Sequence, residues 1–260
     1  MTRDELVARL LHRDGLMLVV DKPAGIPVHR GPKGGENLED YFDALRFGLP
    51  RNPALAHRLD RDTSGCLVLG RHRKALQRLM QLFKQGRVEK AYWSMVEGAP
   101  SEEAGEIDMP LGRLDAARGW WMKIDPLGLP SQTRWRVLGR GLSPDGAPLA
   151  FLELEPLTGR THQLRVHCAA MGWPILGDRV YGSGKGDGAP PLHLHARRIV
   201  APIDKHKPPT AVEAPVPEHM KATLHACGWS GASENVDEVP LAVDRHSGEE
   251  AMVMIMHGRS

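Results

Sequence analysis

The part of the chain richest in potential catalytic groups is the segment HRLDRDTSG at residues 57–65. It combines the carboxylates of Asp60 and Asp62 with two arginines, and it directly precedes the apolar run CLVLG at 66–70. Catalytic groups are often carried on loops that a rigid strand holds in place. The segment therefore indicates a site built around a carboxylate, although ion pairs between these aspartates and arginines on an exposed loop would explain it as well.

A second polar segment, LTGRTHQLRVH at residues 157–167, joins a glycine turn to a predicted helix at 161–171. We expect Thr161 to cap this helix, and His162 and Arg165 to share one face because they are three residues apart. Such a basic edge can bind a phosphate or pair with a carboxylate from elsewhere in the fold. Taken alone, the segment is interpreted equally well as an amphipathic surface helix.

Strands and helices that would position these two segments can be recognised in the pattern of apolar residues. Buried strands are predicted at 16–20 and 66–70, and a helix is predicted after Asn37. A second helix ends at Gly86 and carries apolar residues at helical spacing, namely Leu76, Leu79, Met80 and Phe83. From residue 91 the pattern favours antiparallel strands, at 91–98, 119–124, 132–138, 149–155 and 192–199.

Charge is distributed unevenly along the chain. The net charge is +2, but residues 231–260 contribute −4, so residues 1–230 carry +6. Residues 57–90 hold nine Lys/Arg against three acids, and residues 158–207 hold eight against three. Basic clusters of this size suit a phosphate backbone, but charge alone is equally compatible with solvated helix faces.

The composition and the cysteines favour a cytoplasmic protein. Cys66, Cys168 and Cys227 are an odd number, and the charged first residues lead us to expect no signal peptide, which together argue for a reducing compartment. No apolar run approaches the roughly 20 residues that a membrane-spanning helix requires. The sequence predicts a cytoplasmic location and no membrane partner.

Taken together, the two polar segments resemble the RluA-type family of pseudouridine synthases. The family signature HRLD-x-x-TSG is complete at 57–65, and the resemblance extends over roughly residues 15–205. Five further landmarks appear in order: VVDKPAGIPVH at 19–29, EKAYWSMVEG at 89–98, LTGRTHQLRVH at 157–167, GWPILGDRVYG at 172–182 and LHLHARRI at 192–199.

The resemblance implies both a fold and a reaction. The implied fold is α+β, a pseudouridine synthase fold with a mixed, mostly antiparallel central sheet, flanking helices and a central RNA-binding cleft. The implied enzyme is an isomerase that converts specific uridines to pseudouridine in structured RNA, either ribosomal or transfer RNA, after flipping the base out. It needs no cofactor and no metal, and we expect it to act as a monomer.

The resemblance also assigns roles to individual residues. Catalytic roles fall to Asp60, Tyr92 and Arg165, and RNA-binding roles fall to Arg58, Arg160 and His162. A guanidinium beside Asp60 would favour its charged form and could hold it through two hydrogen bonds. Because Arg165 lies 105 positions after Asp60, this pairing requires the predicted helix at 161–171 to pack across the loop at 57–65.

Two features depart from the pattern of larger relatives. The chain reaches the DKPAG segment within about 20 residues, so we expect no separate RNA-binding domain ahead of it. The acidic segment at 231–260 lies outside the family pattern and is expected to be loosely held. We therefore predict a catalytic domain at 1–230 and a tail at 231–260.

Other classes of protein are less compatible with the sequence. A metal-dependent hydrolase is suggested by thirteen histidines, including His193 and His195, but neither HExxH nor CxxC is present. A serine or cysteine hydrolase at residues 63–66 would need a nucleophile-elbow pattern, which is missing. A catalytically inactive RNA-binding protein of the same fold would show a replaced catalytic residue, and none of the three is replaced.

Overall fold

A computed structural model describes residues 1–31, 34–115, 120–184, 186 and 188–231 of the 260-residue chain. Residues Met1–Ser230 form one compact unit. The expected acidic tail lies, from residue 232 onward, outside the described residues. Within the described part, no helix is long and apolar enough to cross a membrane.

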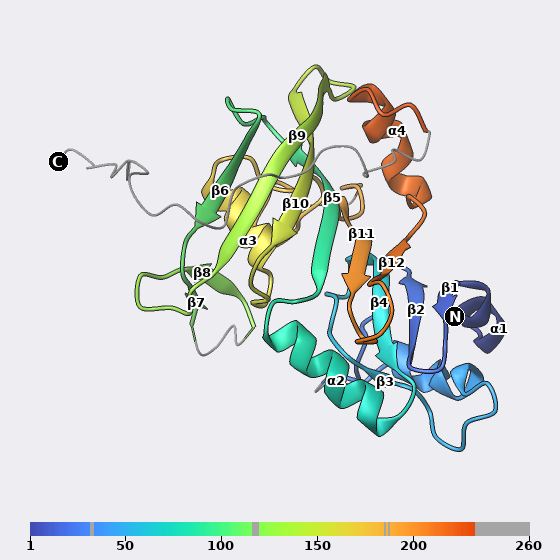
Figure 1. Ribbon diagram of the computed structural model, residues 1–260. Coiled ribbons are helices and arrows are strands. Elements are labelled where there is room, and N and C mark those ends of the chain that lie inside the picture. Colours follow the sequence, from blue (N-terminus) through green and yellow to red (C-terminus); the bar gives the residue numbers. More distant parts are fainter. Residues whose placement is uncertain (32–33, 116–119, 185, 187, 232–260) are drawn as a thin grey trace. The chain divides into compact units, whose positions relative to one another are not determined.

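A ten-stranded sheet runs through the unit, with the strand order β1-β2-β4-β11-β5-β10-β9-β6 (Figure 1). Two short strands lie off this path, because β3 pairs with β4 and β12 pairs with β11. The β4–β11 pair is parallel and the other pairs are antiparallel. The bounds are β1 Leu10–Arg13, β2 Met17–Lys22, β3 Ala54–Leu55, β4 Ser64–Gly70, β5 Glu89–Glu97, β6 Ala104–Asp108, β9 Gln132–Leu142, β10 Pro148–Pro156, β11 Leu194–Ala201 and β12 Thr210–Glu213. The predicted α+β class and mostly antiparallel sheet are confirmed.

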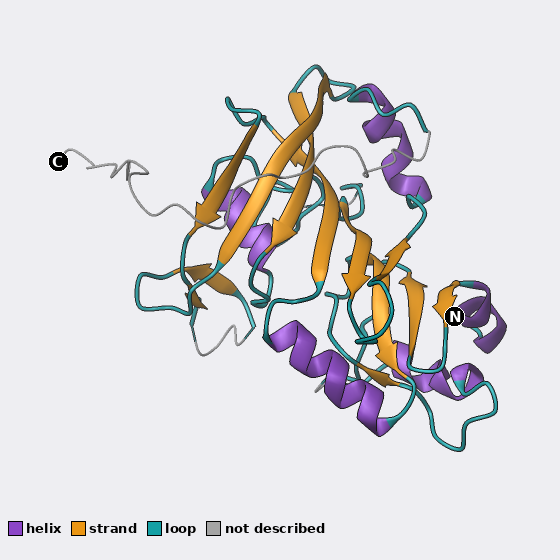
Figure 2. Ribbon diagram, in the orientation of Figure 1, coloured by secondary structure: helices purple, strands orange, loops and turns teal. Residues whose placement is uncertain are grey.

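The helices lie around this sheet (Figure 2). They are α1 Arg3–Ala8, α2 Arg73–Lys84, α3 Gln163–Ala170 and α4 Glu218–Ala226, together with a 3₁₀ helix, η1, at Leu38–Leu45. Helix α2 packs against β4, and α3 packs against β10 and β8. Strand β8 (Met122–Ile124) pairs with β7 (Leu111–Arg113) in a separate small hairpin. The helix predicted after Asn37 is present with Asn37 as its cap, but it is a 3₁₀ helix.

Two predicted elements differ from the structure. The helix expected at 161–171 begins at Gln163, and His162 precedes it with a left-handed φ of 53°. The reason is local: the Gln163 side-chain oxygen accepts hydrogen bonds from the Arg160 amide and the Thr158 hydroxyl, which closes the turn just before the helix. Thr161 is therefore not the cap, and His162 does not share a helical face with Arg165. The strand expected at 119–124 is shorter, covering Met122–Ile124.

Gly65 permits the parallel contact between β4 and β11. Its φ is +104°, and a Cβ at this position would lie 2.3 Å from the Ala196 carbonyl oxygen. Only glycine has both the conformational freedom and the missing side chain that this close approach requires. The parallel pair joins Ser64 to His195 and Gly65 to Ala196, so it fixes the end of the 57–65 loop against the centre of the sheet.

Gly65→Ala is expected to lower the free energy of unfolding by about 3 kcal/mol, because both the left-handed backbone and the overlap with Ala196 must be accommodated. Denaturant unfolding measures this change. Gly15→Ala is the matched control, since open space surrounds Gly15 and its φ is not in the left-handed range. Similar unfolding energies for the two variants would contradict the argument.

Candidate active site

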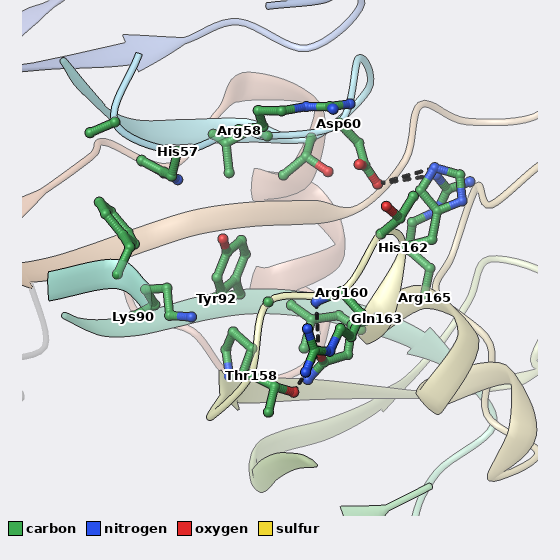
Figure 3. A pocket seen from close by; sticks show the side chains of 18 of the residues that line it. His57, Arg58, Asp60, Lys90, Tyr92, Thr158, Arg160, His162, Gln163 and Arg165 are labelled. Carbon is green, nitrogen blue, oxygen red and sulfur yellow. Dashed lines mark hydrogen bonds and ion pairs between the residues drawn. The ribbon is translucent and has the colours of Figure 1, made fainter. Parts of the chain in front are cut away.

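A cleft of about 800 Å³ opens beside the parallel strand pair. Its walls come from residues 55–60 with Thr63, the C-terminal part of α2, the first residues of β5 and the segment 156–165. All six residues predicted to act in catalysis or RNA binding line it: Arg58, Asp60, Tyr92, Arg160, His162 and Arg165 (Figure 3). The fold thus gathers residues that are widely separated in the sequence into one cavity.

Asp60 and Arg165 are in contact, as expected. The Arg165 Nη1 donates to the Asp60 Oδ2 at 3.3 Å. The side chain of Asp60 is 28% exposed and that of Arg165 is 8% exposed. The carboxylate therefore remains accessible from the cleft, while the guanidinium lies in the wall behind it.

The two-bond clamp on Arg165 comes from a different carboxylate, that of Asp178. Arg165 Nε and Nη2 each donate to Asp178 at 2.8 Å, and the Asp178 side chain is fully buried. Asp178 Oδ1 also accepts the backbone amides of Val180 and Tyr181. The expected bidentate contact with Asp60 is therefore wrong, because the Nε and Nη2 donors of Arg165 are already bound to Asp178.

This arrangement sets the charge of both buried partners. Burial raises the pKa of Asp178, but the hydrogen bonds and charge of Arg165 outweigh it, and the net pKa is lowered. Burial lowers the pKa of Arg165, and Asp178 followed by Asp60 reverses this, so the net pKa is raised. Both groups are ionised at neutral pH. The sequence offered only a weak signal for Asp178, its place in the 172–182 landmark, and nothing that linked it to Arg165.

Lys22, to which the sequence assigned no role, holds the loop that carries Asp60. The Lys22 ammonium is fully buried and donates to the backbone carbonyls of Pro23, Arg61 and Thr63 at 2.8, 2.8 and 2.9 Å. Burial lowers its pKa to about 7. These three bonds tie the turn after β2 to the residues on either side of Asp62, which fixes the backbone next to Asp60.

Tyr92 lies on β5 and lines the cleft (Figure 3). Its hydroxyl has no hydrogen-bond partner among the described residues, so the alternative of a core tyrosine tied to backbone does not hold for this part of the chain. Burial, and secondly the negative charge of Asp60, raise the pKa of Tyr92 above its ordinary value. The phenol is therefore neutral when the cleft is empty, and its hydroxyl is free for a ligand.

His162 lies beside the carboxylate of Asp60. Its Nε2 is 3.6 Å from the Asp60 Oδ2, and its Nδ1 lies 2.8 Å from the Tyr181 hydroxyl. Burial lowers the pKa of His162 despite the opposing charge of Asp60, so the ring is neutral at pH 7. The exposed ring of Trp120 packs edge-on against it with centroids 5.2 Å apart. The His162 side chain is 8% exposed. Its predicted contact with an RNA backbone stays a prediction.

The arginines of the 57–65 loop behave differently from one another. Arg58 is exposed and has no ion-pair or hydrogen-bond partner among the described residues, whereas Arg61 pairs with Asp62 at 3.0 Å. Arg61 and Asp62 therefore form the surface ion pair that the alternative interpretation expected. Asp60 does not, because it pairs with Arg165. Arg160, on the opposite wall, donates from Nε to the Pro130 carbonyl.

The residues that suggested hydrolases are engaged elsewhere in the fold. The Ser64 hydroxyl lies 2.9 Å from His195 Nδ1, but both side chains are buried and neither lines the cleft. Burial raises the pKa of the Cys66 thiol to about 12. His193 Nδ1 faces the Pro191 carbonyl. Among the described residues, no group of three or more His, Cys, Asp or Glu side chains is placed to hold a metal ion.

Asp178→Asn is expected to lower the free energy of unfolding by about 3 kcal/mol, because it leaves the buried Arg165 without its main counter-charge. Asp62→Asn provides the control within the same charge class, since the exposed Asp62–Arg61 pair should contribute less than about 1 kcal/mol. Denaturant unfolding of both variants checks the difference. Equal losses of unfolding free energy would show that the buried pair stabilises the fold no more than the exposed pair does.

Comparisons with known proteins place the chain in a family. A family model described as RNA pseudouridylate synthase matches residues 16–170. An RNA pseudouridine synthase of Zymomonas mobilis, named as uncharacterized, is 43% identical over 216 residues, which cover 82% of this chain and 95% of that protein. The ribosomal large subunit pseudouridine synthase C of Vibrio cholerae is 35% identical over 231 residues, covering 85% of this chain and 69% of that protein.

Solved structures show the same relationship. Human RNA Pseudouridylate Synthase Domain Containing 4 aligns with a TM-score of 0.70 at 28% identity, covering 86% of this chain and 94% of that one. Human RNA Pseudouridylate Synthase Domain Containing 1 aligns with a TM-score of 0.67 at 34% identity, covering 80% and 83%. The expected pseudouridine synthase fold is thereby confirmed. The chain belongs to the RluA-type family of RNA pseudouridine synthases, and it is an isomerase of that class.

Proposed function

We propose that this enzyme isomerises specific uridines in a structured RNA, with Asp60 attacking the anomeric carbon of a flipped-out nucleotide. The observation that carries the proposal is the Asp60 carboxylate, exposed to the cleft and held 3.3 Å from an arginine that Asp178 fixes in place. A charged nucleophile that is positioned and still accessible is what substitution at a sugar carbon requires. Arg165 acts on Asp60 and positions it.

The proposed reaction exchanges one bond of the base for another. Asp60 bonds to C1′ as the bond from C1′ to N1 of uracil breaks. The detached uracil turns within the cleft, and C5 then bonds to C1′ as the carboxylate leaves. N1 gains a proton and C5 loses one, so the product is an isomer of the substrate and the chemistry consumes no co-reactant.

Tyr92 is proposed to stack on the uracil and to take part in removing the C5 proton. Burial, and secondly the charge of Asp60, raise the pKa of Tyr92, so its hydroxyl is a neutral phenol in the free protein. Only the phenolate form of Tyr92 can accept the C5 proton. In the proposed reaction this proton is lost after C5 has bonded to C1′, so Tyr92 acts in the last step.

The cleft has the charge expected for an RNA ligand. Among its described lining residues, five are lysine or arginine and only Asp60 is a carboxylate: Arg58, Lys84, Lys90, Arg160 and Arg165. Arg58 is exposed and unpaired among the described residues, which suits the proposed role of occupying the space of the flipped base or binding a phosphate. Arg160 is proposed to contact the backbone on the opposite wall.

Ribosomal RNA and transfer RNA are both plausible substrates, and the large ribosomal subunit is favoured. The support is the Vibrio cholerae relative, whose name assigns it to that subunit and whose similarity covers 85% of this chain. The flipping step costs a few kcal/mol and is easiest in loops and bulges. We therefore propose an unpaired or weakly paired uridine as the target.

Asp60→Asn is expected to reduce turnover at least about a thousandfold, because an amide is not a nucleophile at the sugar carbon. Pseudouridines should be mapped in all RNA of a deletion strain complemented with wild type, Asp60→Asn or Asp62→Asn. Sites restored by wild type and Asp62→Asn but not by Asp60→Asn identify the RNA and support the role of Asp60. Restoration by Asp60→Asn would refute that role, and a deletion that changes no site would refute the proposed activity.

Tyr92→Phe preserves the stacking ring and removes the hydroxyl, so it should slow turnover about a hundredfold while leaving RNA affinity within about twofold. Release of tritium from RNA labelled at uridine C5 follows the reaction, and filter binding gives the affinity. Tyr92→Ala should lower both the turnover rate and the affinity for RNA. An unchanged rate for Tyr92→Phe would remove the hydroxyl from the mechanism.

A further inference from the structure

Lys90 is a cleft residue to which neither the family signature nor the mechanism above assigns a role. It lies on β5 two residues before Tyr92, and it lines the same cavity. Alternate residues of a strand point to the same face, about 6.6 Å apart. In the view of Figure 3, Tyr92 lies between Lys90 and Asp60. Lys90 is thus placed one strand step beyond the ring on which the uracil is proposed to stack.

The ammonium of Lys90 lacks a counter-charge in the protein. No hydrogen bond or ion pair joins it to any other described residue, and it is not among the exposed lysines. Burial lowers its pKa to about 8, and no acidic group opposes this. At pH 7 the group is still mostly charged, so a partly desolvated cation is present that no anion of the described chain compensates.

The described groups that line the cleft near Lys90 include no anion. The nearby His57 is held neutral, because burial and then the charge of Lys90 lower its pKa to about 3. The His57 Nε2 accepts the Val68 amide, and its ring stacks on Phe83. Lys84, on α2, adds a second cation to the lining. The lining at Lys90 is therefore apolar and positive.

We propose that Lys90 binds a backbone phosphate of the RNA next to the flipped uridine. Lysine is a common phosphate ligand that acts as a point charge, and an ammonium whose charged form burial destabilises gains from an incoming anion. Lys90 and Asp60 line the same cleft with Tyr92 between them in the view of Figure 3, so the ammonium would meet the backbone beside the reacting nucleotide and not the sugar itself. The inference rests on the proposed function in taking RNA as the ligand, and it adds a phosphate subsite to it.

The salt dependence of RNA binding tests this subsite. Affinities are measured in the Asp60→Asn background, without turnover, for a fluorescein-labelled stem–loop RNA whose loop contains only uridines. Lys90→Met should weaken binding about tenfold at low salt and reduce the slope of log K against log[KCl] by about 0.7 to 0.9, the value for one phosphate contact. Lys90→Arg should retain the slope.

Lys74→Met is the matched control, since Lys74 is an exposed lysine of α2 that does not line the cleft and has no partner among the described residues. It should leave the slope unchanged. A wild-type slope for Lys90→Met, or an equal change for Lys74→Met, would overturn the subsite while leaving the proposed activity intact. Failure of the parent Asp60→Asn protein to bind the RNA at all would instead count against the proposed function.

Thermal unfolding without RNA gives an independent readout. Removing an uncompensated cation should leave Lys90→Met with a Tm equal to or above that of wild type. A lowered Tm would show that the protein itself stabilises the ammonium, and it would contradict the proposal. RNA should raise the Tm of wild type more than that of Lys90→Met.

Discussion

The site depends on how the Arg165 guanidinium distributes its hydrogen bonds between the carboxylates of Asp178 and Asp60. Arg165 gives two hydrogen bonds to Asp178, which is fully buried, and one longer bond to Asp60, which is partly exposed. A buried pair with good geometry holds its members rigidly, whereas a single contact leaves the other carboxylate available. Asp178 therefore holds Arg165 in place, and Arg165 contacts Asp60 through a single hydrogen bond that leaves the carboxylate partly accessible.

The backbone beneath Asp60 is fixed by separate means. Lys22 binds three carbonyls around the loop from below, and Gly65 lets the following strand lie directly against β11. These contacts involve backbone atoms, so they fix the position of the loop whatever its exposed side chains do. The result is a carboxylate whose backbone and counter-ion are set by different parts of the chain, which is the pre-organisation that a reaction at a sugar carbon needs.

The sequence predicted the parts of this arrangement that leave a local pattern. Buried strands near 16–20 and 66–70, the helix ending at Gly86 and the β-rich region after 91 are all present. The contact between Asp60 and Arg165 could be anticipated only through the family resemblance, because no periodicity links positions 105 apart. Asp178 and Lys22 were missed as functional groups, since their partners are an arginine side chain and carbonyls that only the folded chain brings near.

The errors near residue 162 have the same origin. The capping preference of Thr161 predicted a start at 161, but the Gln163 side chain closes the preceding turn and the helix begins two residues later. His162 is consequently held in a left-handed conformation beside Asp60. Met80 illustrates the limit of apolar patterns in another way: it follows the helical spacing of α2, yet it is 52% exposed and lines the cleft.

The cleft as a whole is built so that its electrostatics change when RNA enters. In the empty state Lys90 lacks an anion among the described residues, and Tyr92 is kept neutral by burial and by Asp60. A phosphate at Lys90 would supply the missing charge at one end, and covalent use of Asp60 would remove a charge at the other. A phosphate would relieve an unfavourable feature of the free protein, so binding energy would be gained where the backbone lies. The charge of Asp60 would return when the carboxylate leaves C1′, whereas the phosphate contact would hold the RNA throughout the chemistry.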